Sequence, residues 1–133
     1  MTTRLLSSLA AMTLLACGGD GNGTSGPASG PAAPTNVVIT IVNGEIKVTW
    51  DPVAGAQNYN VYMASQAGVT RANYATLPGN MFHPGLPIVF DHPPGLDPNT
   101  LYHFVVTAVN GAGESIESCE ASAQIGGAIG GVC

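Results

Sequence analysis

The sequence predicts an all-β fold in which short antiparallel strands pack as a sandwich. From residue 34 onward, apolar and polar residues alternate with a period of two, which is typical of strands with one buried face. Proline, glycine and asparagine residues interrupt these runs, and no run with helical periodicity follows residue 16. The prolines of this region lie between the expected strands, where their missing N–H group does no harm.

The first two expected strands form a hairpin. Asn43-Gly44 between them is a strong hairpin signal, because both residues tolerate a positive φ angle. The alternating apolar residues are Val37, Ile39 and Ile41 on the first strand and Ile46, Val48 and Trp50 on the second. All six side chains are therefore expected to face one side.

Further strands are expected later in the chain. In one, Tyr59, Val61 and Met63 alternate with Tyr62 and other residues of the opposite face, and residues 102–109 alternate in the same way. Residues 110–113 predict a turn, and residues 115–125 are interpreted as a last, weaker strand. Residues 64–94 are long and rich in proline, so the strand register in this region stays open.

The N-terminus predicts a secretory signal. Arg4 precedes an apolar run from Leu5 to Leu15, and glycine and polar residues follow Cys17. Residues 14–17, Leu-Leu-Ala-Cys, resemble the lipobox of bacterial lipoproteins, which implies cleavage before Cys17 and a lipid on its sulfur. An ordinary secreted protein that is cut nearby is the alternative. Because the run is shorter than the roughly 20 residues of a membrane-spanning helix, lasting attachment to the membrane depends on the lipid.

This interpretation divides the chain into a signal peptide (1–16), a tether (17–33), a folded domain (34–125) and a glycine-rich tail (126–133). The tether has the glycine, serine and proline composition of a flexible linker. Gly18 directly after the cysteine is similar to lipoproteins that are sent to the outer membrane. We therefore expect the chain at the bacterial cell envelope, lipid-anchored, at the outer membrane or cell surface.

The charge balance excludes nucleic acid as a partner. Only 8% of the residues are charged, and beyond residue 16 the eight acids are opposed by two bases, Lys47 and Arg71, for a formal charge of −6. Binding of nucleic acid needs several cations to displace counterions from the phosphates. The same shortage of bases argues against electrostatic attraction to an anionic membrane surface.

Cys119 and Cys133 are a candidate disulfide pair. The chain has three cysteines, and a lipid on Cys17 would leave these two in an oxidising compartment. A bond between them would hold the glycine-rich tail against the domain. Two free thiols, or a tail cysteine that pairs with another molecule, are the alternatives.

The expected strand region contains several separated motifs: Pro34-Thr35-Asn36-Val37, Trp50-Asp51-Pro52, Tyr59-Asn60-Val61-Tyr62, residues 96–110 and Gly113-Glu114-Ser115. Together they resemble a fibronectin type III domain, which has an immunoglobulin-like antiparallel β-sandwich fold. The resemblance implies a structural core around Trp50 and Tyr59. It also implies that Leu96 and Tyr102 form a tyrosine corner, in which the phenol bonds back to upstream backbone.

No enzyme, metal site or cofactor is predicted. The candidate acid–base residues are His83, His92 and His103, and a metal site would need three or four ligands from a set such as His83, Asp91 and His92. We interpret the residues of the proline-rich segment as loop residues in water. The sequence contains neither a Gly-x-Ser-x-Gly motif nor a glycine loop of the kind that binds phosphate.

The remaining candidate site is a surface. If Tyr102 points inward, Tyr62, Val105 and Val109 point outward on neighbouring strands and form an apolar stripe, which is typical of a contact site. Two alternatives stay open for this stripe. Residues 64–94 cover it, or its residues reflect the β-propensity of strands alone.

The predicted function is that of a non-catalytic envelope lipoprotein, a binding or spacer module that contacts an envelope protein or polysaccharide. A carbohydrate-binding accessory domain and a structural subunit of a larger envelope assembly are the alternatives. A carbohydrate site normally has a row of exposed aromatic residues, and only Tyr62, Tyr74 and Phe82 are available for one here.

Overall fold

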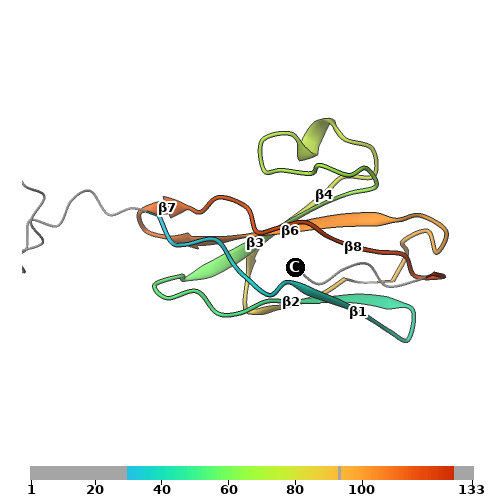
Figure 1. Ribbon diagram of the computed structural model, residues 1–133, viewed down its shortest axis with the longest axis horizontal. Coiled ribbons are helices and arrows are strands. Elements are labelled where there is room, and N and C mark those ends of the chain that lie inside the picture. The colour runs from blue at the N-terminus through green and yellow to red at the C-terminus, as the bar shows by residue number, and fades with distance from the viewer. Residues whose placement is uncertain (1–29, 93, 128–133) are drawn as a thin grey trace, which may run out of the picture.

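The computed structural model describes residues 30–92 and 94–127, and it confirms the all-β sandwich (Figure 1). The strands in chain order are β1 (Val38–Val42), β2 (Glu45–Thr49), β3 (Asn58–Ala64), β4 (Met81–Leu86), β5 (Val89–Asp91), β6 (Tyr102–Asn110), β7 (Gly113–Glu114) and β8 (Ala121–Ala123). A 3-10 helix, η1 (Tyr74–Thr76), lies between β3 and β4. The expected signal peptide, Cys17 and Cys133 lie outside the described residues.

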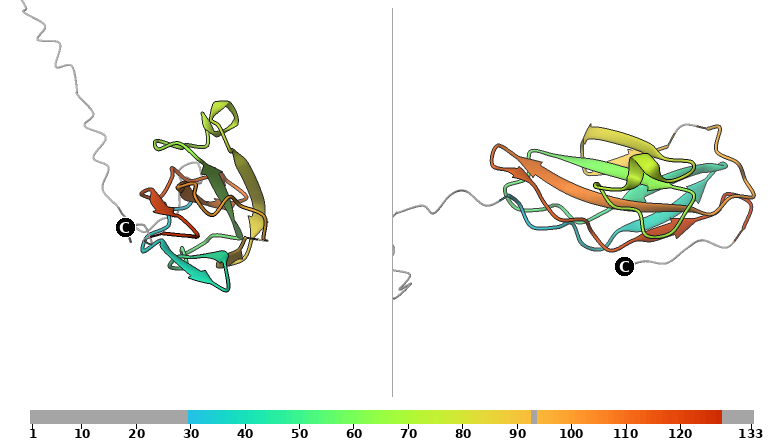
Figure 2. Two further views of the ribbon diagram at one scale, coloured as in Figure 1. Left: turned by 90° about the vertical axis from the view of Figure 1, so that its right-hand side faces the viewer. Right: turned by 90° about the horizontal axis from the view of Figure 1, so that it is seen from above.

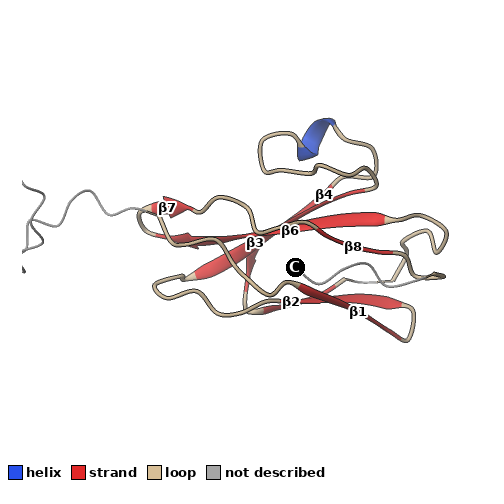
Figure 3. Cartoon of the chain, viewed as in Figure 1, coloured by secondary structure: helices blue, strands red, loops and turns tan. Residues whose placement is uncertain are grey.

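The strands form two antiparallel sheets that pack face to face (Figure 3). Sheet A has the strand order β1-β2-β5, and sheet B has the order β4-β3-β6-β7 with β8 also paired to β6. The long strands β3 and β6 pair in the middle of sheet B, where Tyr62 lies opposite Val105. The strands β4 and β5 are edge strands of their sheets.

The β1–β2 hairpin has the turn that the sequence predicts. Asn43 and Gly44 have φ angles of 53° and 78°, as a two-residue turn with positive φ at both positions requires. This turn sets the register, so that Val42 lies opposite Glu45 and Ile39 lies opposite Val48. The inward alternation of apolar residues then runs through both strands.

The inner faces of the two sheets enclose one hydrophobic core. Trp50 and Tyr59 lie in it, 4% and 7% exposed, with ring centroids 5.3 Å apart. The hydroxyl of Tyr59 accepts a hydrogen bond from the Val53 N–H group at 2.8 Å. The core tyrosine therefore also fixes the loop that follows β2.

The start of β6 is fixed in a similar way by Tyr102. Its ring is buried in the core, and its hydroxyl accepts a hydrogen bond from the Asp97 N–H group at 3.1 Å. Leu96, which precedes that donor, is buried in the same core. The arrangement is the tyrosine corner that the family resemblance implies.

The C-terminal strand differs from its prediction. Residues 115–125 do not form one strand, because β7 ends at Glu114 and β8 begins at Ala121. Between the two short strands every third side chain is buried, namely Ser115, Ser118 and then Ala121. A repeat of three therefore replaces the period of two that a strand would have.

The two buried serines explain this repeat. The N–H groups of Ala108 and Val106 on β6 donate hydrogen bonds to Ser115 Oγ at 2.9 Å and Ser118 Oγ at 3.0 Å. Serine hydroxyls thus bond the backbone of β6 where a regular strand would offer carbonyl groups. Small polar side chains that bond to backbone in this way compete with regular secondary structure.

The region whose register the sequence leaves open contains β4 and β5. The strand β4 pairs with β3, with Met81 opposite Met63, and β5 pairs with β2 in the other sheet. Residues 65–80, which include η1, form a long loop beside the outer face of sheet B (Figure 2). None of the described residues belongs to a helix that is long and apolar enough to cross a membrane.

Candidate functional site

The outer face of sheet B contains the residues expected to form an exposed apolar stripe. Tyr62 and Val105 are only 4% and 3% exposed, and they pack with Val69 in a second hydrophobic cluster. Val69 belongs to residues 65–80, which we call the cover segment. The expectation of an open stripe is therefore wrong at Tyr62 and Val105, because the chain between β3 and β4 folds back over them. Val109, near the end of β6, is half-buried.

The cover segment has a defined shape of its own. At its base the N–H and Oγ groups of Ser65 both donate to the Pro78 carbonyl oxygen at 2.9 Å. Further out, Thr70 N–H donates to Asn73 Oδ1 at 2.7 Å, and Asn73 N–H donates to Thr70 Oγ1 at 3.1 Å. Reciprocal bonds of this kind hold a turn, and this turn leads into η1.

Three glutamates from the end of β7 to the start of β8 contribute to the contacts between the sheet, the C-terminal chain and the cover segment. The carboxylates of Glu117 and Glu120 bond the cover segment itself. In contrast, Glu114 bonds the sheet with its carboxylate and Arg71 with its backbone carbonyl. The Oε2 atom of Glu120 accepts hydrogen bonds from the Gly68 and Val69 N–H groups at 2.7 and 3.1 Å. Its Oε1 atom lies 2.8 Å from Nδ1 of His103 on the outer face of β6. Glu120 therefore joins the cover segment to the sheet beneath it.

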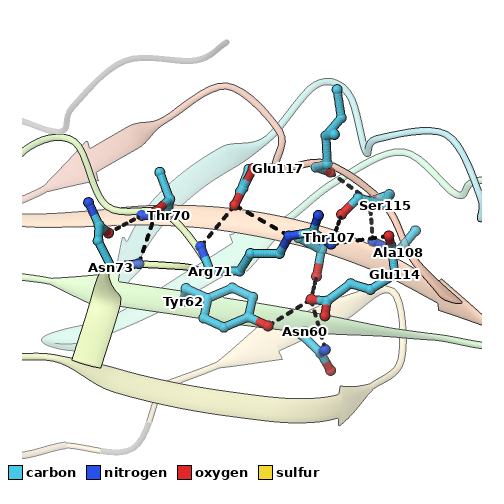
Figure 4. Close-up of polar contacts among 11 residues, drawn as sticks. Asn60, Tyr62, Thr70, Arg71, Asn73, Thr107, Ala108, Glu114, Ser115 and Glu117 are labelled. Carbon is cyan, nitrogen blue, oxygen red and sulfur yellow. Dashed lines mark hydrogen bonds and ion pairs between the residues drawn. The ribbon is translucent and has the colours of Figure 1, made fainter. Parts of the chain in front are cut away.

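Arg71 makes the second set of contacts between the cover segment and the C-terminal chain (Figure 4). Its backbone N–H donates to Glu117 Oε1 at 2.9 Å, and its Nε atom lies 3.8 Å from the same oxygen. Its Nη1 group donates to the carbonyl oxygens of Glu114 and Ser115 at 3.1 and 2.9 Å. One arginine thus bonds a carboxylate and two backbone carbonyl groups.

The carboxylate of Glu114 collects three hydrogen bonds on one oxygen (Figure 4). Its Oε1 atom accepts from Tyr62 Oη at 2.7 Å, from Asn60 Nδ2 at 3.1 Å and from Thr107 Oγ1. Burial raises the pKa of Glu114, but the bonds from Thr107, Tyr62 and Asn60 outweigh burial and hold this pKa below its ordinary value. Burial, and then the bond to Glu114, raise the pKa of Tyr62.

Three aromatic rings meet at one side of the cover segment. Tyr62 and Phe82 stack with centroids 4.8 Å apart, and Tyr74 lies 4.9 Å from Tyr62 and 5.5 Å from Phe82. Phe82 on the edge strand β4 is 39% exposed and Tyr74 is half-buried, whereas Tyr62 is buried beneath them. The three residues available for a carbohydrate site thus form a cluster and not a row. We call its exposed part, Tyr74 and Phe82, the aromatic patch.

Two of the three histidines lie between the sheets. The interpretation of His83 and His92 as loop residues in water is wrong. His83 belongs to β4, His92 directly follows β5 and is 4% exposed, and their ring centroids are 5.4 Å apart. Asp91 does not join them, because its carboxylate is exposed and forms an ion pair with Lys47 at 3.6 Å.

The remaining expected site features concern metal binding and the cysteines. Among residues 30–92 and 94–127, no group of three or more His, Cys, Asp or Glu side chains could hold a metal ion, and no pocket is found. Cys119 is exposed between β7 and β8. Because Cys17 and Cys133 lie outside the described residues, lipid attachment and the Cys119–Cys133 pairing stay predictions.

The glutamate contacts were not foreseen from the sequence, although a signal for them exists. Glu114-x-x-Glu117-x-x-Glu120 spaces three of the eight acids evenly, and Arg71 is the only base between residues 64 and 94. One position later, Ser115, Ser118 and Ala121 repeat with the same spacing. Two offset repeats of three indicate an extended segment with one buried and one polar side, and not a β-strand.

The chain is similar in sequence to a known protein family and to a phage protein. The family model "Fibronectin type III domain" matches residues 32–124. The tail tube protein gp17.1* of Bacillus phage SPP1 is 33% identical over 96 residues, a match that covers 69% of this chain. The chain spans only 31% of that relative's length.

Solved structures with the same architecture have little sequence in common with this chain. A Fn3-like protein from Clostridium thermocellum has a TM-score of 0.56 at 24% identity, covering 71% of this chain and 92% of that one. The FN5 domain of Drosophila Lar has a TM-score of 0.55 at 23% identity, covering 74% of this chain and 99% of that one. These likenesses support the fold.

Proposed function

The chain belongs to the fibronectin type III family. From this membership we propose that it is a non-catalytic module that contacts a protein partner, and from residues 14–17 that it is lipid-anchored through Cys17 at the bacterial cell envelope. Domains of this family are generally binding or structural modules. The relative from phage SPP1 is by its name a tail tube protein, which supports a structural role over a catalytic one.

The point at which the tether enters the fold gives the proposed module a direction. Gly30 lies beside β7, so close that a side-chain Cβ there would be 3.4 Å from the Glu114 carbonyl oxygen. The turn between β1 and β2 lies at the other end of the sandwich (Figure 1). With a lipid on Cys17, the tether would join the domain at the end with the β6–β7 turn, and the β1–β2 turn would lie at the end farther from the attachment point.

The observation that carries the proposed contact is the aromatic patch. Phe82 exposes 39% of its surface on an edge strand, on the same face as Tyr62, and packs against Tyr74 of the cover segment. Contact surfaces between proteins are enriched in aromatic residues. The rings of Tyr74 and Phe82 are tilted by 38° and pack on one another, so they do not offer the flat row that favours a sugar chain. A protein partner therefore fits this patch better than a polysaccharide.

The anchor is tested by the intact mass of the full chain purified from membranes. The expected mass corresponds to a chain that begins at Cys17 and carries acyl groups, and Cys17→Ala should shift the protein from the membrane fraction to the soluble one. A chain of unmodified mass, or one whose membrane fraction is the same after Cys17→Ala, would contradict the proposed anchor.

The contact is tested by placing a photo-crosslinking residue at position 82 in cells, with position 116 as the matched control. Ile116 is 69% exposed and lies between β7 and β8, away from the aromatic patch. A discrete protein adduct from position 82 alone supports the proposal. Adducts from neither position, together with glycan-array binding that Phe82→Ala abolishes, would replace the protein partner with a polysaccharide.

A further inference from the structure

A cluster of metal-binding atoms lies where the edge strands of the two sheets approach each other. Met81 and His83 of β4 lie opposite Met63 and Val61 of β3. Both partners are completely buried, and residues directly opposite one another in a sheet share a face. Met81 and His83 therefore project from the inner face of sheet B, at its edge.

Sheet A supplies the other half of the cluster. Phe90 of β5 lies opposite Val48 and is buried in the core. His92, two residues further, continues this pairing, since its N–H donates to the Ile46 carbonyl oxygen at 2.8 Å. Because side chains alternate along a strand, His92 points to the same inner side as Phe90, toward β4.

Two of the donor atoms lie close together, and the ring of the third residue is adjacent. The Met81 Sδ atom lies 3.3 Å from His92 Nε2. The rings of His83 and His92 stand almost perpendicular, at 85°, with centroids 5.4 Å apart. Metal bonds of about 2.0 Å to imidazole nitrogen and about 2.3 Å to sulfur separate two ligands of one ion by roughly 3 to 4 Å. The Met81–His92 distance already falls in this range.

His83 has a feature that packing alone does not explain. Its Nε2 atom is buried and has no hydrogen-bond partner, although buried polar atoms are nearly always paired. A buried imidazole nitrogen of this kind can offer its lone pair to a metal ion, because neutral imidazole is a common metal ligand.

We propose that Met81, His83 and His92 form a binding site for Cu(I). Imidazole binds copper readily, and the soft thioether favours Cu(I) over the harder divalent ions. The site lies at the surface end of the inter-sheet space, where the 39% exposure of Met81 gives an ion access. Phe90, whose ring lies 4.3 Å from that of His83, closes the inner side with an apolar wall.

The test is a competition titration of Cu(I) under argon, with a chromophoric Cu(I) chelator and the full chain after its free thiols are alkylated. Alkylation removes thiols, which would bind Cu(I) elsewhere. Met81→Leu keeps an apolar side chain of similar size at an exposed position, and it should weaken Cu(I) binding at least tenfold. His83→Gln should do the same, whereas the matched control His103→Gln should leave the affinity unchanged.

A second readout identifies the site directly. In protein labelled at the methionine methyl groups, Cu(I) or its redox-inert analogue Ag(I) should shift the Met81 signal and leave that of the buried Met63 in place. Equal Cu(I) affinity in wild type, Met81→Leu and His83→Gln, or an unchanged Met81 signal, would overturn the proposal and leave the cluster as packing.

Discussion

The Tyr62 hydroxyl donates a hydrogen bond to Glu114 Oε1 at 2.7 Å, across 52 positions of sequence. Tyr62 lies under the cover segment, and Glu114 is the last residue of β7, where Arg71 of the cover segment bonds its carbonyl oxygen. The pair therefore joins the sheet, the C-terminal chain and the cover segment. It also explains how a tyrosine whose ring points away from the core is buried without leaving its hydroxyl unpaired.

We expect Glu114→Ala to destabilise the fold and to loosen the cover segment. A hydrogen bond to a charged group contributes at most about 1.5 to 3 kcal/mol to stability. Because Glu114 is partly exposed, each of its bonds contributes less, and we expect the free energy of unfolding to fall by about 1 to 3 kcal/mol in total. Denaturant unfolding measures the loss. Trypsin cleavage after Arg71, the only basic residue of the cover segment, measures the loosening.

The matched control is Glu45→Ala, at an exposed position of β2. It should change neither the free energy of unfolding nor the cleavage rate after Arg71. If Glu114→Ala behaves like this control, the carboxylate does not fix the end of β7, to whose carbonyl oxygen Arg71 of the cover segment bonds.

The stability of the domain should fall in acid, partly through Glu114. Its pKa is lower in the folded protein than in the unfolded chain, so the unfolded state binds the proton first as the pH falls. The stabilisation is therefore complete above the unfolded pKa of about 4.3 and is lost as the pH falls toward the folded pKa. Unfolding free energies measured from pH 6 to 3 should have a shallower slope in Glu114→Gln. An unchanged slope would contradict the lowered pKa.

Val105→Asp should unfold or strongly destabilise the domain. Val105 is 3% exposed beneath the cover segment, and an unpaired carboxylate there costs about 3 kcal/mol or more. Val42→Asp is the control, because Val42 is 51% exposed on β1 and should change the stability by less than about 0.5 kcal/mol. Thermal melting compares the two variants. A Val105→Asp protein with a normal melting temperature would mean that the outer face is open in solution.

Trp50→Ala should be the most damaging core substitution. The indole is 4% exposed and packs on Tyr59, and truncation of a buried Trp or Phe to Ala costs about 3 to 5 kcal/mol through the cavity it leaves. Trp50→Phe, which fills part of the cavity, should lose less. A thermal melt in which Trp50→Ala matches wild type would remove Trp50 from the core.

Tyr102→Phe should cost less than Trp50→Ala, because it removes a hydrogen bond and leaves the ring in place. The bond from the Asp97 N–H group to the hydroxyl contributes about 1 kcal/mol. Tyr59→Phe removes the corresponding bond from Val53 and should have an effect of similar size. Denaturant unfolding of both variants checks this, and a loss as large as that of Trp50→Ala would indicate that the rings repack.

The parts of the fold that could be predicted are determined by residues that are close together in the sequence. Asn43-Gly44 predicts its turn because the needed φ angles are properties of those two residues. The alternation around Val48 and Val61 predicts which side chains face the core, because successive strand residues point to opposite sides. The sequence predicts a strand for residues 115–120, and this prediction is wrong because the buried serines follow a repeat of three and not the repeat of two that a strand has.

By itself, the sequence determined the all-β class, the hairpin turn and the buried face of each strand, because these follow from backbone preferences and from local periodicity. The tertiary structure alone decided what covers the other face of sheet B. Alternation shows that Tyr62 points away from the core, but it does not show whether water or protein lies there. That outcome depends on contacts such as Gly68 with Glu120, 52 positions apart, which local backbone preferences and periodicity do not specify.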